Sequence, residues 1–293
     1  MAASAMADMA VVRYHVQPRP YSGIYDYYAK VLDLALSKTV ARYGAYSLKP
    51  VEFAASNPRL NQLLEYGQDI NVLVAQPNQE RDERFVPVRI PLDKGLLGYR
   101  IMIIRSADAA LFSAVRSVED LRRLHLGQGF DWEDTHVLAA AGLPVEVASD
   151  RSTLMDMLGR GRFQGFPRGV YEIDEELENH ASSDSPPLQA EAGLMLHYKA
   201  TKIFYVSKAD APLAERLEAG LRMAIADGSF DRLFYSHPTI AGALQRANFA
   251  GRRVFELPNP RIPATFPVDD PELWYVPPEM GGGLARRERP RRG

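Results

Sequence analysis

The chain has 293 residues, enough for one large domain or two lobes of common size, and its 46% apolar and 25% charged residues are ordinary for a globular protein. A formal net charge of -2 gives no sequence-wide case for binding nucleic acid or an anionic membrane surface. The absence of cysteine excludes disulfides, zinc–thiolate sites and thiol nucleophiles.

The two ends of the chain differ in composition from the rest. No apolar run approaches the roughly 18 residues that a spanning helix needs, and the first ten residues, MAASAMADMA, lack the basic and hydrophobic regions of a signal peptide. Ala5-Met6-Ala7 still has the small-x-small pattern of a cleavage site. We therefore expect either a flexible start or a truncated or mis-started export signal. Arginines gather after residue 283 and predict a disordered basic tail over 281–293.

Strand and helix patterns alternate through the first part of the chain. The expected elements are, in order, a strand at 10–16, a helix at 25–43, a strand at 47–54, a helix at 56–67 and a strand at 70–75. Ser56 is placed as an N-cap and Gly67 as a helix terminator. A β-α-β-α-β order predicts a parallel sheet with helices on both faces. The polar segment 76–91 then follows the carboxyl end of a strand, where open α/β sheets bind ligands.

The second part begins with an apolar strand at 99–104, which we take as the hinge. The elements expected after it are helices at 117–124, 131–141 and 152–158 and strands at 125–129, 145–148 and 162–166. A polar, proline-containing stretch at 176–189 predicts a surface loop. The last expected elements are a strand at 202–206 and helices at 210–228, 230–235 and 239–247, before prolines dominate.

This order predicts an α/β protein of two lobes, each a mostly parallel sheet flanked by helices, with a cleft where the chain crosses over. The predicted division is lobe one over 10–105 and 193–257, lobe two over 106–192, a surface-wrapping segment over 258–280 and the basic tail over 281–293.

No strong catalytic motif is present. The sequence contains no G-x-S-x-G nucleophile elbow, P-loop, H-E-x-x-H or G-x-G-x-x-G pattern, and its histidines show no metal-ligand spacing. We therefore expect no cofactor and no catalytic residue. Aromatic side chains near the start of the first helix often line clefts, and we take two of them as binding residues, Tyr21 and Tyr25.

The expected strand at 125–129 ends in a glycine loop before a helix. Backbone N–H groups around Gly129 are therefore candidates for binding an anion. The acids Asp131, Glu133 and Asp134 already place negative charge on the first turn, which disfavours a carboxylate or phosphate ligand there. Trp132 either stacks on a ligand in the cleft or packs in the core.

Two arginines are candidates for ligand contacts. Arg84 ends the charged run 79–84, which by itself is typical of a solvated face. Arg168 follows an apolar strand and lies in a proline–glycine turn, where its guanidinium could make a bidentate contact with a carboxylate. The alternative for Arg168 is a salt bridge to Glu172 or Glu175.

Four stretches carry a resemblance to a known family: PLDKGLLGYR at 91–100, GQGFDWEDT at 127–135, GRFQGFPRG at 161–169 and DGSFD at 227–231. Together with the order of elements they resemble the bacterial extracellular solute-binding proteins of family 3, in a branch of transporter substrate-binding domain proteins. The resemblance implies the type II periplasmic binding protein fold over about residues 10–280. It also implies a periplasmic, monomeric substrate-binding component of an ABC transporter, with a permease or membrane sensor as partner and no nucleic acid.

The resemblance also implies roles for particular residues. An arginine shortly before the hinge strand commonly holds the ligand carboxylate in this family, and Arg84 fits that position by spacing. The acid that commonly holds the ligand ammonium has no counterpart here before Glu172, which argues against an ordinary α-amino acid. Two arginines, Arg84 and Arg168, facing one cleft favour an anionic ligand.

Two further functions stay open. An enzyme of the dehydratase or lyase type would use a cleft carboxylate, with Glu172 or Asp131 as candidates, and a strongly raised pKa of such a carboxylate would favour it. A sensor or interaction module would have a collapsed or hydrophobically filled cleft.

Overall fold

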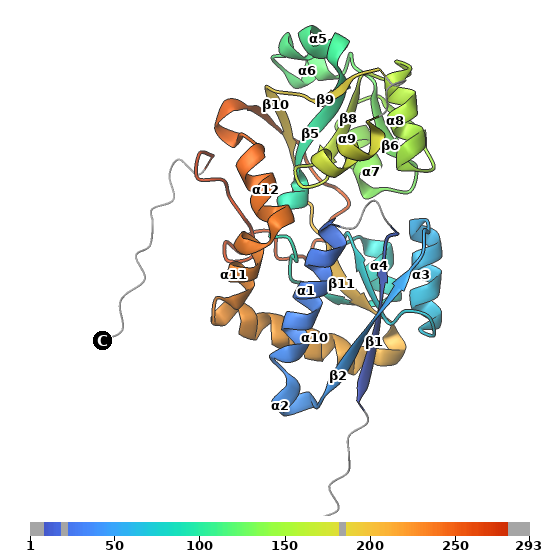
Figure 1. Cartoon of the computed structure of the whole chain (residues 1–293), viewed down its shortest axis with the longest axis vertical. Helices are drawn as coiled ribbons and strands as arrows, with labels where there is room; N and C mark the ends of the chain where they lie inside the picture. Colours follow the sequence, from blue (N-terminus) through green and yellow to red (C-terminus); the bar gives the residue numbers. More distant parts are fainter. Residues whose placement is uncertain (1–8, 19–22, 182–185, 281–293) are drawn as a thin grey trace, which may run out of the picture.

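The computed structural model describes residues 9–18, 23–181 and 186–280, which form two lobes that lie one above the other in Figure 1. Each lobe is built on one β-sheet with helices packed against it. The predicted two-lobed α/β fold is therefore confirmed. Tyr21, the possible cleavage pattern and the basic tail lie outside the described residues.

The first sheet forms the core of the lower lobe. Its strands, in spatial order, are β2 (Tyr46–Glu52), β1 (Ala10–Val16), β3 (Val72–Ala75), β11 (Ile203–Val206) and β4 (Val86–Val88). The pairs of β1 with β2 and β3 are parallel, whereas β11 runs antiparallel to β3 and β4. The sheet is mixed because β11 enters it from the other lobe. We had expected a mostly parallel sheet.

The second sheet forms the core of the upper lobe. Its strands, in spatial order, are β12 (Arg253–Glu256), β10 (Leu194–His197), β5 (Tyr99–Arg105), β8 (Gly165–Gly169), β6 (Leu126–Gly129) and β7 (Val145–Ala148), with β9 (Leu188–Ala190) also paired to β5. Strand β5 runs antiparallel to β8 and β10. Residues 99–105, 194–197 and 253–256, which the predicted division gives to lobe one, thus lie in the second sheet. The sequence of an apolar strand such as β5 suits either sheet, and only the strands that pair with it show which sheet it belongs to.

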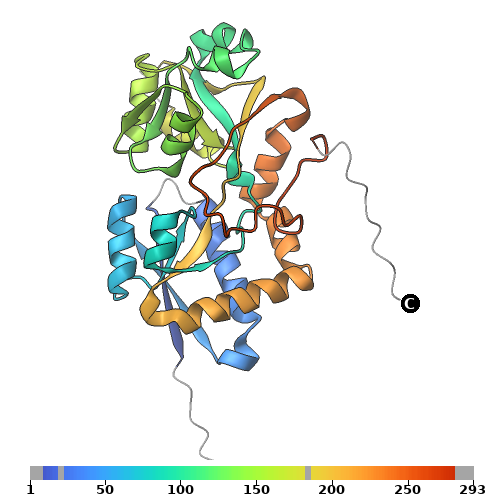
Figure 2. The same ribbon diagram turned by 180° about the vertical axis from the view of Figure 1, so that it is seen from behind.

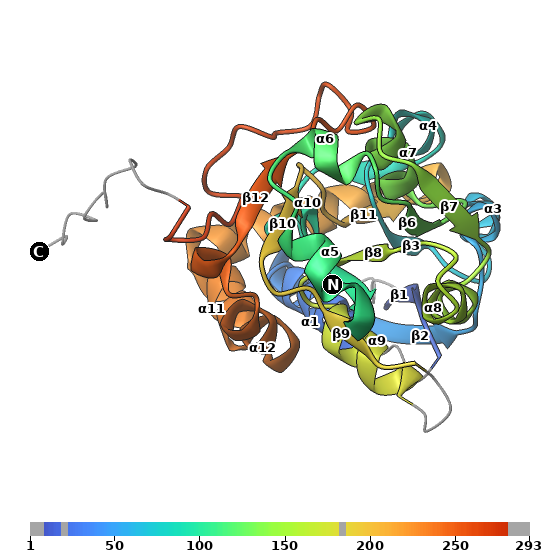
Figure 3. The same ribbon diagram turned by 90° about the horizontal axis from the view of Figure 1, so that it is seen from above.

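Helices cover both sheets. In chain order they are α1 (Gly23–Ser37), α2 (Val40–Tyr43), α3 (Asn57–Tyr66), α4 (Gln79–Arg84), α5 (Ala109–Ser113), α6 (Val118–Leu121), α7 (Glu133–Ala140), α8 (Arg151–Gly159), α9 (Ile173–His180), α10 (Ala211–Ala226), α11 (Ser229–Ser236) and α12 (Pro238–Arg246). The view from above shows α11 and α12 together on the opposite side of the molecule from α3 and α8 (Figure 3).

Several boundaries differ from the predicted ones, each for a local reason. Helix α4 has no apolar residue to give a helical period, and Asn78 begins it by accepting a hydrogen bond from the Arg81 amide. Helix α9 occupies part of the expected loop at 176–189. Strand β8 is shifted to Gly165–Gly169 and includes the expected proline–glycine turn, because the whole segment is buried between β5 and β6. Strands β4, β9, β10 and β12 were not predicted.

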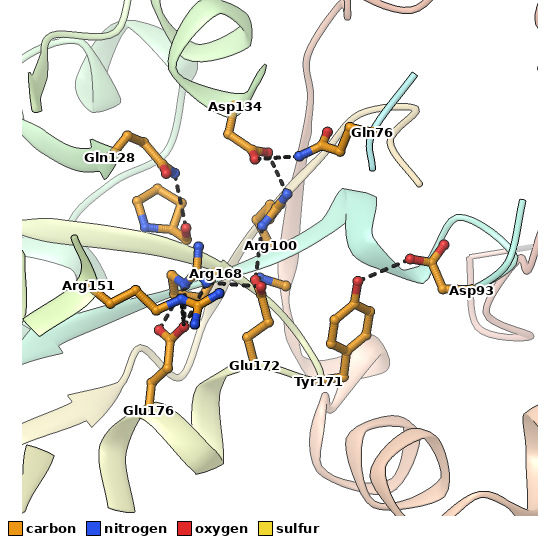
Figure 4. Close-up of polar contacts among 12 residues, drawn as sticks. Gln76, Asp93, Arg100, Gln128, Asp134, Arg151, Arg168, Tyr171, Glu172 and Glu176 are labelled. Atoms are coloured by element: carbon orange, nitrogen blue, oxygen red, sulfur yellow. Dashed lines mark hydrogen bonds and ion pairs between the residues drawn. The ribbon is translucent and has the colours of Figure 1, made fainter. Parts of the chain in front are cut away.

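A buried carboxylate ties together the segments that cross between the lobes. Asp93 is 0% exposed and accepts hydrogen bonds from the hydroxyls of Tyr28, Tyr171 and Thr201 and from the Gly95 amide. Tyr171 follows β8 in the upper lobe, and Figure 4 shows its contact with Asp93. Tyr28 lies on α1 in the lower lobe, so the contacts of Asp93 reach both lobes. Burial raises the pKa of Asp93, and the hydroxyl donors partly offset that effect.

The segment after β12 runs back across the crossing, as the view from behind shows (Figure 2). The Tyr275 amide donates to the Lys94 carbonyl at 2.7 Å, and the Asn259 side chain donates to the Lys199 carbonyl at 2.7 Å. Phe266 and Trp274 are buried. Residues 258–280 therefore lie over the crossing and add no sheet of their own.

Helices α1 and α10 pack so closely that a side chain is excluded at their contact. A Cβ atom at Gly220 on α10 would come within 1.9 Å of the Ala35 carbonyl oxygen on α1. A glycine inside a helix costs about 0.5–1 kcal/mol relative to alanine. This cost is offset by the packing of α10 onto the first lobe.

We expect Gly220→Ala to destabilise the protein by about 1–3 kcal/mol in urea unfolding, because the backbone of α1 cannot move aside as a side chain can. Gly242→Ala on α12 is the matched control. Its Cβ would meet only the end of the Arg246 side chain, so stability should be unchanged or rise by up to about 1 kcal/mol. Equal changes in the two variants would contradict this packing.

Candidate ligand-binding site

A cavity of about 560 Å³ lies between the lobes. The first lobe and the crossing contribute polar side chains from the ends of strands and the starts of helices, among them His15, Tyr25, Asn57, Gln76, Arg81 and Lys202. The second lobe contributes Trp132, Asp134, Arg151, Arg168 and Glu172. The cavity therefore depends on both lobes and lies at the carboxyl end of β3, where such sheets bind ligands.

The acids at the start of α7 bind the first lobe. The Asn57 amide, at the start of α3, donates to Asp131 at 2.7 Å. The Arg81 guanidinium, on α4, donates to Glu133 at 3.1 Å. These side chains bond across the interlobe space, so the first turn of α7 joins the two lobes.

Glu133 receives three donors from two segments of the chain. Arg81 and Glu133 have side chains only 4% and 8% exposed. Asn78 also donates to Glu133, and Arg261 from the segment behind the lobes donates to it at 2.9 Å. A buried carboxylate is costly unless charges and hydrogen bonds compensate it. The charge of Arg81 is therefore already balanced by Glu133, and no ligand is needed for that.

Arg100 forms the centre of the polar network in Figure 4. It lies on β5, is 1% exposed, and donates to Asp134 and, at 3.2 Å, to Glu172. Gln76 from the first lobe donates to the other oxygen of Asp134 at 2.9 Å, and the Tyr198 hydroxyl also donates to Asp134. Burial alone would raise the pKa of Asp134, but the guanidinium of Arg100 and the hydrogen bonds from Tyr198 and Gln76 together outweigh it and lower that pKa.

Arg168 is 2% exposed on β8 and is bound by carboxylates of its own lobe. Its Nη2 lies 2.6 Å from Glu176 and 2.9 Å from Glu172, and its guanidinium carbon lies 4.7 Å from the centre of the Trp132 ring. Burial favours the neutral acid at Glu172, yet the guanidiniums of Arg168 and Arg100 lower its pKa. The ion-pair alternative for Arg168 is the observed one, with Glu176 in place of Glu175.

The structure brings together some of the predicted site residues. Tyr25, Trp132 and Arg168 line the cavity. Trp132 covers Gly129, since a Cβ atom there would lie 2.4 Å from the indole ring, and Gly129 does not line the cavity. Arg84 points elsewhere and bonds Glu80 and Glu65 on the surface of the first lobe.

The sequence reasoning missed several lining residues: Gln76, Arg81, Arg100, Asp134 and Lys202. A signal existed for Gln76 and Arg81, because the polar segment directly after β3 was expected to face ligands. Arg100 interrupts an apolar strand, and a charge at such a place needs buried partners. Arg81, on the same short helix as Arg84, lines the cavity, but its guanidinium already donates to Glu133.

Other kinds of site find no support in the described part of the chain. No group of three or more histidine, aspartate or glutamate side chains among these residues is placed to hold a metal ion. Within the same residues, no helix is both long and apolar enough to cross a membrane.

Comparison with known proteins rests on structure alone. No family model matches this sequence, and no curated protein matches it either. Among solved structures, the VFT2 domain of Bordetella pertussis BvgS, in a double mutant, is similar with a TM-score of 0.57 at 16% identity, over 78% of this chain and 93% of that domain. A probable amino-acid ABC transporter extracellular-binding protein from Bacillus subtilis, ytmK, has a TM-score of 0.56 at 14% identity, over 79% and 98%.

An ancestral arginine-binding protein, bound to arginine, has a TM-score of 0.54 at 16% identity, over 78% of this chain and 98% of its own. The chain has the two-lobed fold of the type II periplasmic binding proteins. The resemblance proposed from the sequence therefore gave the correct fold, and at identities this low the similarity extends to the fold alone.

We expect Glu133→Ala to lower the free energy of unfolding by about 3–5 kcal/mol, because Arg81 would be left buried without its carboxylate. Urea unfolding measures the loss. The control is Glu65→Ala, which breaks the exposed Glu65–Arg84 pair and should cost less than about 1 kcal/mol. A loss of under about 1 kcal/mol in Glu133→Ala would show that the interlobe pair contributes little.

Proposed function

We propose that this protein binds a small polar solute in the cavity between its lobes, and that the lobes close on the solute by a hinge motion. The observation that carries the proposal is a cavity of about 560 Å³ lined by charged and aromatic side chains from both lobes. Its volume is in the range of small-molecule sites, and lining from two bodies lets closure bury the solute.

The proposed role is that of a substrate-binding component of an ABC-type transporter, acting outside the cytoplasmic membrane as a monomer with a membrane permease or sensor as partner. Support comes from the fold, which is shared with binding proteins such as the probable amino-acid transporter component from Bacillus subtilis. The crossing around Asp93 supplies a fixed point about which such lobes rotate.

The contacts of the cavity carboxylates favour binding over catalysis. A general acid or base at neutral pH requires a raised carboxyl pKa. The pKa of Glu172 is instead lowered, and its carboxylate is held by Arg100 and Arg168. The other candidate, Asp131, accepts a hydrogen bond from Asn57. A cavity of this volume also argues against the collapsed cleft of a pure interaction module.

We expect one selective solute to raise the thermal unfolding midpoint of the purified protein when amino acids, organic acids, polyamines and short peptides are compared. A ligand at about a thousand times its dissociation constant adds roughly 4 kcal/mol, and a chain of this size shifts by about 2–4 °C per kcal/mol. The solute should be recovered chemically unchanged. Its conversion to a product would support an enzyme instead.

Two tryptophan variants test whether the thermal shift arises from binding in the cavity. Ala54 is exposed and lines the cavity, so Ala54→Trp should abolish the shift by filling the space. Ala110 is exposed on α5 and is not a lining residue, so Ala110→Trp should leave the shift unchanged. An undiminished shift in Ala54→Trp would place binding elsewhere, and no shift with any solute would overturn the proposed function.

A further inference from the structure

The charged side chains that line the cavity differ in how they are compensated. Arg81 is paired with Glu133, Arg100 with Asp134, and Arg168 with Glu172. Arg151, a further lining cation, is paired with Glu176. Within residues 9–18, 23–181 and 186–280, the ammonium of Lys202 makes no hydrogen bond or ion pair.

The backbone of Lys202 is fixed although its side chain is free. Lys202 immediately precedes β11, where the chain returns to the first lobe. Its carbonyl accepts hydrogen bonds from the Leu92 amide at 2.9 Å and from the Thr201 hydroxyl at 3.2 Å. The lysine is thus anchored on the crossing between the lobes, with a four-carbon side chain that can adjust to a solute.

The surroundings of Lys202 disfavour the charged form of its ammonium group, but not enough to neutralise it at pH 7. Burial, and next the guanidinium of Arg81, lower the pKa of Lys202 to about 8, while Glu172 and Asp134 act in the opposite direction. Since this pKa lies above neutrality, the ammonium remains mostly protonated at pH 7. A partly buried cation without a partner is costly, and an anion that enters the cavity would relieve that cost.

We propose that Lys202 binds the carboxylate of the solute, in place of an arginine, and that the ligands of this protein are therefore small organic carboxylates. The inference rests on the proposed function, since it names the solute class of the same cavity. One unpaired ammonium balances one negative charge, which favours a carboxylate over a doubly charged phosphate monoester. Arg81 is unsuited to the same role because Glu133 already supplies it with a carboxylate.

The first test compares wild-type protein with Lys202→Met and Lys202→Arg in thermal unfolding. The carboxylate probes are succinate, L-glutamate, L-arginine and benzoate, and the probes without a carboxylate are putrescine and ribose. We expect one of the carboxylates to stabilise the wild type. Lys202→Met should weaken that binding on the order of 100-fold, because a charged partner is lost in a buried site, and Lys202→Arg should retain most of it.

Stability of the free variants separates loss of binding from loss of folding. Lys202→Met removes an uncompensated charge, so its unfolding midpoint without any probe should equal or exceed that of the wild type. Undiminished carboxylate binding in Lys202→Met would overturn the inference. Stabilisation by putrescine or ribose alone would overturn it too but leave solute binding intact, whereas no stabilisation by any probe would count against both.

The pH dependence of binding provides a second readout. In wild-type protein, carboxylate affinity should fall by up to about tenfold per pH unit above about pH 8, as Lys202 loses its proton. The facing groups do not mimic this change. Guanidinium groups are not deprotonated in proteins. Burial lowers the pKa of His15, and the pKa values of Asp134 and Glu172 are lowered as well. Lys202→Arg should show a flat profile from pH 7 to 9, and a fall equal to that of the wild type would overturn the inference.

Discussion

The guanidinium of Arg100 is withdrawn almost completely from water, and the arrangement of the interlobe site depends on the two carboxylates that compensate it. Asp134 comes from the start of α7 and Glu172 from the turn after β8, so the ion pairs place both elements beside β5. Asp134 then has an oxygen left for Gln76 of the first lobe. A single buried charge on the crossing strand thus fixes where the lobes meet. Removal of either carboxylate would leave it uncompensated, which is more costly than the loss of an exposed pair.

The same pairing rule underlies the ligand selectivity that we propose for the cavity. Carboxylates of the chain itself form ion pairs with Arg81, Arg100 and Arg168. Glu133 lies where a ligand carboxylate would otherwise reach Arg81. Arg168, which looks like a ligand contact in the sequence, is therefore already bound by carboxylates of its own lobe. In our proposal, recognition is left to Lys202, the one lining lysine or arginine in the described part of the chain whose charge has no internal partner. The ligand class follows from what remains uncompensated, and the number of lining cations does not decide it.

Much of the fold was predictable because its signals are local. Ser56 and Gly67 bound α3 as expected, and Ser117 with Asp120 forms the capping box that begins α6. The site was less predictable because the role of each charged side chain depends on partners far away in the sequence. Arg84 was chosen by spacing, but α4 has no apolar period from which to orient it, and Arg81 turned out to line the cavity. Nothing local distinguishes Lys202 from other lysines, since its role depends on carboxylates that pair with other residues.

If the two lobes close on a solute, the distance between them must change when the solute binds. The chain has no cysteine, so Tyr66→Cys on α3 and Val147→Cys on β7 would carry two spin labels at exposed positions, one on each lobe. Double electron–electron resonance would be recorded without solute and with the stabilising solute at saturation. We expect a broader, longer distance distribution without solute and a shorter, narrower one with it. The same distribution in both states would contradict closure on a ligand.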